Sequence, residues 1–214
     1  MGNAFITILL ATGTTLLLTV VSAVIGIVLG APVMLLSQSK NPLLRWLYST
    51  FVHLVRGVPA LVWLFIAFFG ITQLGITLSP MASAITTLSV IAVASMAEIY
   101  RGGIAAIAKG QWEASAALGL RPLNTALDVI FPQLLRAVSP TGATFVVGLL
   151  KESALASTIG VAEITFEAGL QVQYFGNGLT FFAFAGLIYL LLSLPLGMFS
   201  RTLHTRLTRR YAVL

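Results

Sequence analysis

The chain has 214 residues, of which 58% are hydrophobic and only 8% are charged, and its mean hydropathy is +1.00. This composition excludes an ordinary water-soluble domain and predicts one integral membrane domain. Cysteine is absent, so disulfides, thiolate nucleophiles and cysteine-based metal sites are excluded. The net charge of +6 would suggest nucleic acid in a soluble protein, but in a membrane protein the position of the basic residues matters more, and no nucleic-acid partner is expected.

Long uncharged runs predict membrane-spanning helices. No Asp, Glu, Lys or Arg occurs before Lys40, between Arg56 and Glu98, or between Glu167 and Arg201, whereas about 20 apolar residues suffice to cross a bilayer. The runs are apolar on every face, which favours helices over the alternating strands of a barrel. Turn residues divide them into five predicted spans, at about residues 5–36, 57–72, 81–100, 139–162 and 179–199.

Basic residues fall in alternate connections between these spans. The connections around residues 72–80 and 160–178 contain no Lys or Arg. By the positive-inside rule the basic connections are cytoplasmic, which predicts an external N-terminus and a cytoplasmic C-terminus. The basic residues are Lys40, Arg45 and Arg56, then Arg101, Lys109, Arg121 and Arg136, and finally Arg201, Arg206, Arg209 and Arg210.

The first two spans carry packing and turn signals. Gly26 and Gly30 form a small-x-x-x-small pair that permits close helix packing. The second span is predicted to begin at Arg56-Gly57-Val58-Pro59, with Pro59 in its first turn. His53 is expected to be an interfacial packing residue and not a metal ligand, because the only other histidine is His204. No metal site is therefore predicted.

Spans three and four contain the acidic residues nearest the membrane. Glu98 and Arg101 are spaced to share a helix face, so a local ion pair is expected. Lys151 and Glu152 are adjacent and point about 100° apart, so each needs a partner elsewhere. Glu163 follows Glu152 by eleven residues, which predicts one acidic face on span four. The candidate substrate-pathway residues are Glu98, Lys151, Glu152, Ser153 and Glu163.

The last third of the chain is predicted to be an external connection followed by one span. Residues 165–178 are polar and Gly-rich, which indicates a loop with one helical turn. Pro195 is expected to kink span five. The sequence beyond it, SRTLHTRLTRR, is typical of a basic helix end that anchors the cytoplasmic side.

No enzyme motif is present. The chain lacks a phosphate-binding Gly-rich loop, a nucleophile elbow and an HExxH sequence. Catalytic residues and a cofactor of its own are therefore not predicted, and any energy source must come from a partner. The only sizeable surface offered to the cytoplasm is the segment 102–138.

Within that segment the positions of glycine and proline predict a helix-turn-helix. Residues 111–118 favour a short helix, Gly119 suits a left-handed C-terminal cap, and Pro122 suits the start of a second helix. Pro132 is predicted to end that helix. The hairpin would present a docking surface made of Leu118, Leu120, Glu113 and Arg121.

This hairpin resembles the EAA loop of ABC importer permeases. The family pattern is Glu-Ala-Ala, three residues, Gly, nine residues, Ile, any residue, Leu-Pro. Here it reads Glu113-Ala114-Ser115, Gly119 and Val129-Ile130-Phe131-Pro132, with Ser, Val and Phe as departures and the spacing intact.

Further motifs resemble the polar amino acid uptake subfamily, and the resemblance extends from about Thr14 to Leu207. They are RGVP from Arg56, EIYRGGI from Glu98, KGQWEA from Lys109, PQ at Pro132, and LKESAL from Leu150. The family usually has an acid near the position of His204, so this chain departs from the family pattern there.

The resemblance implies a type I ABC importer permease fold in the bacterial inner membrane. It implies a partner permease, either a second copy or a sister chain, two cytoplasmic ATPase subunits that bind ATP and Mg²⁺, and an external amino-acid-binding protein. The resemblance implies that Glu113 and Gly119 are coupling residues. With the rest of the motif and the predicted docking surface, the candidate coupling residues are Glu113, Ala114, Ser115, Leu118, Gly119, Leu120, Arg121 and Pro132.

Cargo and function retain alternatives. An acidic face of Glu152 and Glu163 would favour a cationic amino acid such as arginine, lysine or histidine. Either acid could instead pair with a Lys or Arg of the sister subunit. The alternative functions are a membrane scaffold that uses the hairpin only for docking, a permease for another small polar solute, and an exporter or lipid-handling permease.

Overall fold

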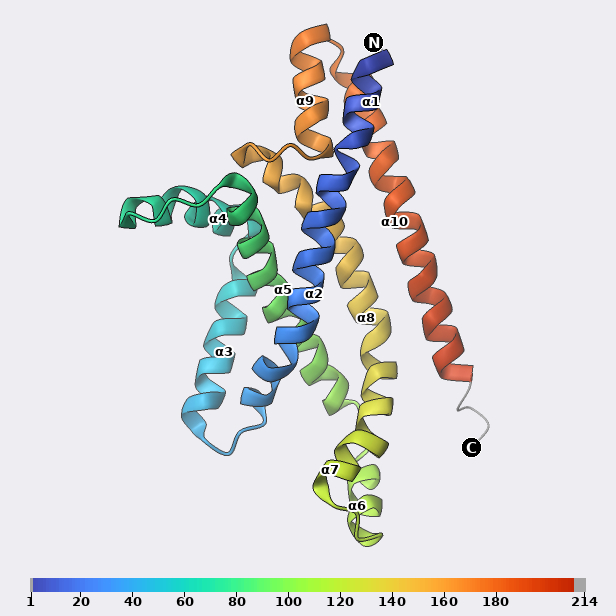
Figure 1. The fold of residues 1–214 in the computed structure, drawn as a ribbon. Coiled ribbons are helices and arrows are strands. Elements are labelled where there is room, and N and C mark those ends of the chain that lie inside the picture. Colours follow the sequence, from blue (N-terminus) through green and yellow to red (C-terminus); the bar gives the residue numbers. More distant parts are fainter. Residues whose placement is uncertain (1, 210–214) are drawn as a thin grey trace.

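The computed structural model describes residues 2–209, with side chains through Met198, and every regular element in that range is helical (Figure 1). The predicted all-α class is therefore confirmed. The predictions for the basic side chains beyond Phe199 and for His204 lie outside the described side chains. The elements are α1 (Gly2–Leu10), α2 (Thr12–Ser37), α3 (Pro42–Gly57), α4 (Ala60–Phe65), η1 (Ile66–Gly70), η2 (Ile71–Leu74), α5 (Pro80–Ala105), α6 (Lys109–Ala117), α7 (Pro122–Asn124), η3 (Thr125–Ile130), α8 (Phe131–Glu152), η4 (Ser153–Ile159), α9 (Ile164–Phe175) and α10 (Gly178–Arg209).

Four helical stretches are long and apolar enough to cross a membrane, and a bent pair of helices gives a fifth. The pair consists of Pro42–Gly57 and Ala60–Leu74 and is bent by 99°. In Figure 1, α9 and the start of α1 lie at one end of the bundle, and α6 and α7 lie at the other. We call these the α9 end and the hairpin end. The four straight stretches are Gly2–Ser37, Pro80–Ala105, Pro122–Ile159 and Gly178–Met198.

The bend between α3 and α4 follows from Pro59. A residue before proline is disfavoured in the helical region, and Val58 accordingly adopts φ −108° and ψ 136°, which ends α3. The Trp63 indole N–H donates to the Val55 carbonyl at 3.1 Å, so a hydrogen bond crosses the break. The predicted second span is therefore a broken element, and Arg56 lies at the bend and not inside a continuous helix.

Helices α2 and α5 approach each other very closely. A Cβ atom added to Gly26 would lie 2.5 Å from Ala92 Cβ, and one added to Gly30 would lie 2.8 Å from Met96 Cβ. Both contacts advance together along the two helices, which therefore run parallel. The small-residue pair that the sequence indicates thus packs within the chain, and it allows dispersion contacts along much of both helices.

Pro132 does not end the second helix of the hairpin, so that prediction is wrong. The helix continues from the π-helical segment η3 into α8, which contains Pro132 in its first turn. A proline ring clashes with the carbonyl four residues earlier in a regular α-helix. That residue here is Asp128, and it lies within η3, where the wider turn accommodates the ring.

The predicted shared acidic face of Glu152 and Glu163 is also wrong. After Glu152 the helix tightens into the 3₁₀ segment η4, and Gly160 then turns the chain with φ +89°. Glu163 instead caps the next helix, because its Oε1 accepts the Phe166 N–H at 2.9 Å. The prediction of a loop with one helical turn at residues 165–178 is also wrong. The cap at Glu163 starts the helix α9, which takes up most of this segment.

The α2–α5 packing predicts a strong effect of side-chain volume at Gly26. We expect Gly26→Val to lower the free energy of unfolding by about 1–3 kcal/mol, because the added atoms meet the Ala92 backbone and the helices must separate. The matched control is Gly13→Val, since nothing lies within 4 Å of a Cβ atom there. Thermal unfolding followed by fluorescence-detected size-exclusion chromatography measures both, and equal losses in the two variants would contradict the expectation.

Candidate functional site

Two adjoining cavities lie where α5 faces α8 and the bend between α3 and α4. The larger has a volume of about 570 Å³ and the smaller about 370 Å³, which is the range of small-molecule sites. Arg56, Ser95 and Phe145 line both cavities, so they form the common wall between them. The site is therefore a pair of chambers that share one cationic side chain.

Helical periodicity explains how polar residues reach these chambers. On α5 the lining residues Ile91, Ser95, Glu98 and Gly102 recur every three or four positions, which places them on one helix face. The lining residues of α8 repeat in the same way and include hydroxyl groups and one acid. They are Ala137, Thr141, Thr144, Phe145 and Glu152.

Glu152 is the acid of the smaller cavity, and it lacks a partner there. Its Oε2 atom is buried and makes no hydrogen bond to any described residue. Glu152 also lines a tight neighbouring space with Thr87, whose buried hydroxyl is likewise without a hydrogen bond. A buried carboxylate oxygen without a donor is costly, so this side chain is ready to accept one from a ligand.

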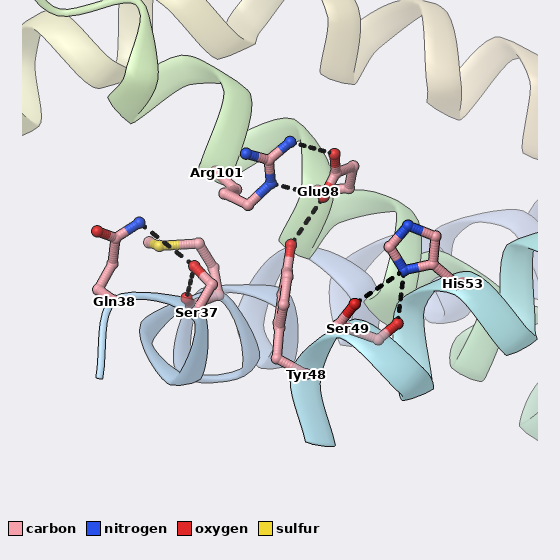
Figure 2. Close-up of polar contacts among 8 residues, drawn as sticks. Ser37, Gln38, Tyr48, Ser49, His53, Glu98 and Arg101 are labelled. Atoms are coloured by element: carbon pink, nitrogen blue, oxygen red, sulfur yellow. Dashed lines mark hydrogen bonds and ion pairs between the residues drawn. The ribbon is translucent and has the colours of Figure 1, made fainter. Parts of the chain in front are cut away.

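Glu98 lines the larger cavity but is fully engaged. Arg101 Nε and Nη2 donate to its two oxygens at 2.9 and 2.6 Å, and the Tyr48 hydroxyl donates to Oε2 at 2.8 Å (Figure 2). The expected ion pair with Arg101 is thus confirmed. The contact with Tyr48 joins α5 to α3, and the Tyr100 hydroxyl joins α5 to α2 by donating to the Ile27 carbonyl at 3.0 Å. Glu98 therefore acts in the structure as a tie between helices.

Glu163 lies at the α9 end and lines neither of the two cavities. Its side chain is fully buried and accepts hydrogen bonds from the Tyr189 hydroxyl at 2.5 Å, the Phe166 N–H at 2.9 Å and the Thr15 hydroxyl at 3.5 Å. Burial raises the pKa of this carboxyl, while the hydrogen bonds from Tyr189 and Phe166 act in the opposite direction. Glu163 consequently joins α9 to α2 and α10, and it lines neither cavity.

The two neighbours of Glu152 also lie outside the cavities. Lys151 is exposed, and the Ser153 hydroxyl is buried and donates to the Leu150 carbonyl at 2.7 Å. Neither residue lines one of the two chambers. Of the five candidate pathway residues, the structure thus brings Glu98 and Glu152 to the paired cavities and places the other three elsewhere.

The hairpin between α5 and α8 has the predicted turn. Gly119 adopts φ +68°, and the Leu120 N–H donates to the Ser115 carbonyl at 3.1 Å, which is the hydrogen bond of a Schellman cap. Glu113, Ala114 and Arg121 are exposed and Ser115 is buried. The exposed apolar side chains at this end are Trp112, Leu118, Leu120, Leu123 and Leu127, with Leu118 the most exposed at 77%.

A hydrogen bond between two glutamines closes the base of the hairpin. The Gln133 side-chain amide donates to Gln111 Oε1 at 3.1 Å and also to the Val129 carbonyl at 2.9 Å. This bond joins α6 to α8, so the two arms are held together below the turn. The hairpin is thus built as one unit with an apolar tip.

Sequence reasoning missed three of these roles. Arg56 was used for topology, for the start of the second span and in the RGVP motif, but it was not among the candidate pathway residues. Its position directly before Gly57-Val58-Pro59 indicates a helix end where a side chain can reach a neighbouring helix. The pairing of Gln111 with Gln133 joins residues of two motifs and has no local signal. The partner of Glu163, Tyr189, lies in an otherwise apolar span, and an isolated tyrosine hydroxyl there is the one clue that a polar partner exists.

The family model of binding-protein-dependent transport system inner membrane components matches residues 22–212. YckA of Bacillus subtilis strain 168, a probable amino-acid ABC transporter permease protein, is 38% identical over 181 residues, which are 83% of this chain and 78% of YckA. TcyB of the same organism, an L-cystine transport system permease protein, is 34% identical over 199 residues, which are 92% of this chain and 85% of TcyB.

The fold is similar to a solved transporter structure. A chain in the crystal structure of an amino acid ABC transporter with histidines matches with a TM-score of 0.89 at 27% identity, and the match covers 94% of both chains. The stretch matched by the family model, residues 22–212, contains the hairpin and every residue that lines the two cavities.

The cluster at Glu163 predicts that Tyr189 stabilises the α9 end. We expect Tyr189→Phe to lower the free energy of unfolding by about 1–3 kcal/mol, because a buried carboxylate loses a donor. Tyr174→Phe is the matched control, since that side chain is 77% exposed. The melting temperatures of the two purified variants provide the measurement, and a Tyr189→Phe protein as stable as the control would show that this hydrogen bond contributes nothing.

Proposed function

The chain belongs to the family of binding-protein-dependent transport system inner membrane components, and we propose that it is the permease subunit of an ATP-driven importer of amino acids. The transported class is supported by the names of its relatives, which include an amino-acid and an L-cystine permease. The observation that carries the proposal within the structure is the cavity pair, whose smaller member is lined by Glu152, an acid with one buried oxygen that lacks a hydrogen-bond partner.

The proposed orientation places the hairpin end in the cytoplasm and the α9 end outside. Lys40, Arg45, Arg101 and Lys109 belong to connections or helix ends on the hairpin side, whereas the connection containing α9 has no Lys or Arg. The positive-inside rule supports this orientation. The N-terminus is then external, and the protein is a multi-pass component of a bacterial inner membrane.

We propose that a positively charged group of the cargo binds next to the Glu152 carboxylate. A cation in the smaller cavity would pair with the Glu152 carboxyl group, for which no described residue provides an ion pair. This favours a cationic amino acid, whose side chain or α-ammonium group could occupy that position. The larger cavity, which lies toward the hairpin end through Glu98, Gly102 and Ala106, is the proposed exit chamber.

The energy source is proposed to be a cytoplasmic ATPase that docks on the hairpin. The chain has no nucleotide-binding motif of its own, so ATP and Mg²⁺ would be bound by that partner. Leu118, Leu120 and Leu123 form an exposed apolar tip, with Glu113 and Arg121 exposed beside it. An exposed apolar patch with a charged rim is typical of a protein-protein contact.

Two further partners complete the proposed assembly. A second copy or a sister permease would provide the opposite wall of the pathway, because up to five spans make a small bundle for enclosing a polar solute. A binding protein outside the membrane would deliver the cargo, as the family description implies. Helix α9, held by Glu163, is the structured element at that end.

Transport measurements on Glu152→Gln test the proposed cargo site. In proteoliposomes with the ATPase and the binding protein, we expect uptake of a cationic amino acid to fall roughly tenfold, because a charge-assisted hydrogen bond is lost. Glu167→Gln is the control, since Glu167 lines neither cavity. Unchanged uptake of every candidate cargo in Glu152→Gln would remove the argument for this site.

Stimulation of ATP hydrolysis tests the permease role itself. Hydrolysis by the purified complex should rise when an amino-acid-loaded binding protein is added. A complex whose hydrolysis stays the same across a panel of loaded amino acids would favour the scaffold alternative.

Coupling through the hairpin is tested at Gly119. We expect Gly119→Val to leave ATP hydrolysis in place while uptake is lost, because a β-branched residue resists the left-handed conformation that φ +68° requires. Gly110→Val is the matched control: nothing lies within 4 Å of an added Cβ at either position, but only Gly119 has a positive φ. Uptake that remains tightly coupled to hydrolysis in Gly119→Val would show that this turn is not the lever.

A further inference from the structure

Arg56 is a cationic side chain in the wall of both cavities, and its charge acts on the Glu98 carboxylate without a direct contact between the two. No hydrogen bond or ion pair joins its guanidinium to another described residue, and the ion pair found in that part of the chain is between Arg101 and Glu98. The side chain is exposed and extends from the last turn of α3, directly before the bend. A guanidinium presents a planar fork of donors that fits a carboxylate with two parallel hydrogen bonds.

The smaller cavity thus contains opposite charges that do not neutralise each other. Arg56 and Glu152 both line its 370 Å³ volume, yet they do not approach within the 4.0 Å of an ion pair. Ser95 and Phe145 lie in the same wall, so a hydroxyl and an aromatic ring accompany the two charges. This arrangement fits a ligand that carries one negative and one positive group separated by a short chain.

Glu98 and Arg56 attract each other across the larger cavity, but no hydrogen bond or ion pair joins these two described residues. Both of its oxygens accept hydrogen bonds from Arg101, and one also accepts from Tyr48 (Figure 2). Glu98 is therefore hydrogen-bonded to residues of α5 and α3, and the N–H donors of Arg56 make no hydrogen bond to it. The same hydrogen bonds therefore link α5 to α3 and leave the N–H donors of Arg56 without a hydrogen bond to Glu98.

We propose that Arg56 binds the α-carboxylate of the transported amino acid, while the positively charged end of the cargo lies toward Glu152. This inference rests on the proposed function. Because Arg56 belongs to the common wall, the carboxylate can stay on it while the rest of the cargo moves from the smaller cavity to the larger. The cavity pair consequently selects molecules with a free carboxylate and rejects the corresponding amines.

The first test compares each amino acid with its decarboxylated form, which differs only in the group that Arg56 would bind. The wild-type permease-ATPase complex in lipid nanodiscs, without the binding protein, is equilibrated with radiolabelled arginine or agmatine, lysine or cadaverine, histidine or histamine, and glutamine or 4-aminobutanamide. We expect at least one amino acid to bind roughly tenfold more tightly than its amine, as a bidentate charge-assisted pair provides. Equal affinity within every pair overturns the proposal.

The second test assigns the discrimination to Arg56. Arg56→Gln should reduce the affinity for the amino acid to that for the amine and leave the affinity for the amine unchanged. The matched control is Arg45→Gln, which removes an exposed basic residue from the same helix without touching a cavity. A preference for the amino acid that survives in Arg56→Gln overturns the proposal.

Further outcomes distinguish a failure of the proposed cargo site from a failure of the proposed role of Arg56. If Arg56→Gln does not assemble, Arg56→Lys keeps the charge but cannot bind both oxygens in a fork, and an undiminished preference in that variant overturns the proposal. If the wild-type complex binds none of the amino acids, the cargo site under the proposed function is wrong. If it binds them but does not distinguish the amines, only the role of Arg56 is wrong.

Discussion

The rest of the structure depends on the close approach of α2 and α5, in which Gly26 and Gly30 leave no room for a side chain against Ala92 and Met96. Dispersion contacts at such short separation fix the rotation of α5 about its axis. Once that rotation is fixed, the neighbouring face of α5, with Ser95 and Glu98, has to point toward α8 and the bend. The polar lining of the cavities is therefore set by an apolar contact on the adjacent face of the same helix.

Three glutamates show how environment decides the role of one residue type. Glu98 has a guanidinium and a phenol beside it and serves as a tie between helices. Glu163 is buried among a hydroxyl, a phenol and a helix N-terminus, where it acts as a cap. Glu152 lines the smaller cavity and has one buried oxygen to which no described residue donates a hydrogen bond. Only the third arrangement leaves a charge for something that is not part of the chain, which is why it carries the argument for cargo.

Sequence patterns predicted the features that depend on neighbouring residues. The Gly119 cap, the Glu98–Arg101 pair and the apolar spans follow from local rules, and the structure confirms them. Predictions that assumed a regular α-helix were wrong where the backbone changes to another helix type or turns. Extrapolating from Glu152 to Glu163 assumed a regular helix, whereas Gly160 turns the chain between them. Pro132 was expected to end a helix, but the π-helical turn before it absorbs the steric conflict.

The long-range roles could not be predicted for a different reason. Tyr48 with Glu98 and Tyr189 with Glu163 join residues 50 and 26 positions apart, and no periodicity within one helix specifies such pairs. The role of Arg56 depends on a 99° bend and on the faces of two other helices. Its local sequence indicates a helix end but gives no information on which cavity lies beyond that end.

The hairpin, which is the proposed docking site of the ATPase, adjoins the two helices that line the cavities. The hairpin joins α5 to α8, and these are the two helices whose facing sides line both chambers. Near its base, Gly103 lets Val138 and Leu134 approach so closely that an added Cβ would lie 2.3 Å from Val138 Cγ1. Gln111 and Gln133 hold the two arms together just beyond that contact. A force applied at Leu118 and Leu120 therefore reaches a tight contact between α5 and α8 before it reaches Ser95 and Phe145. Because packed helices shift as units and do not deform continuously, movement of the hairpin would change the separation of the two lining faces, and with it the space around Arg56.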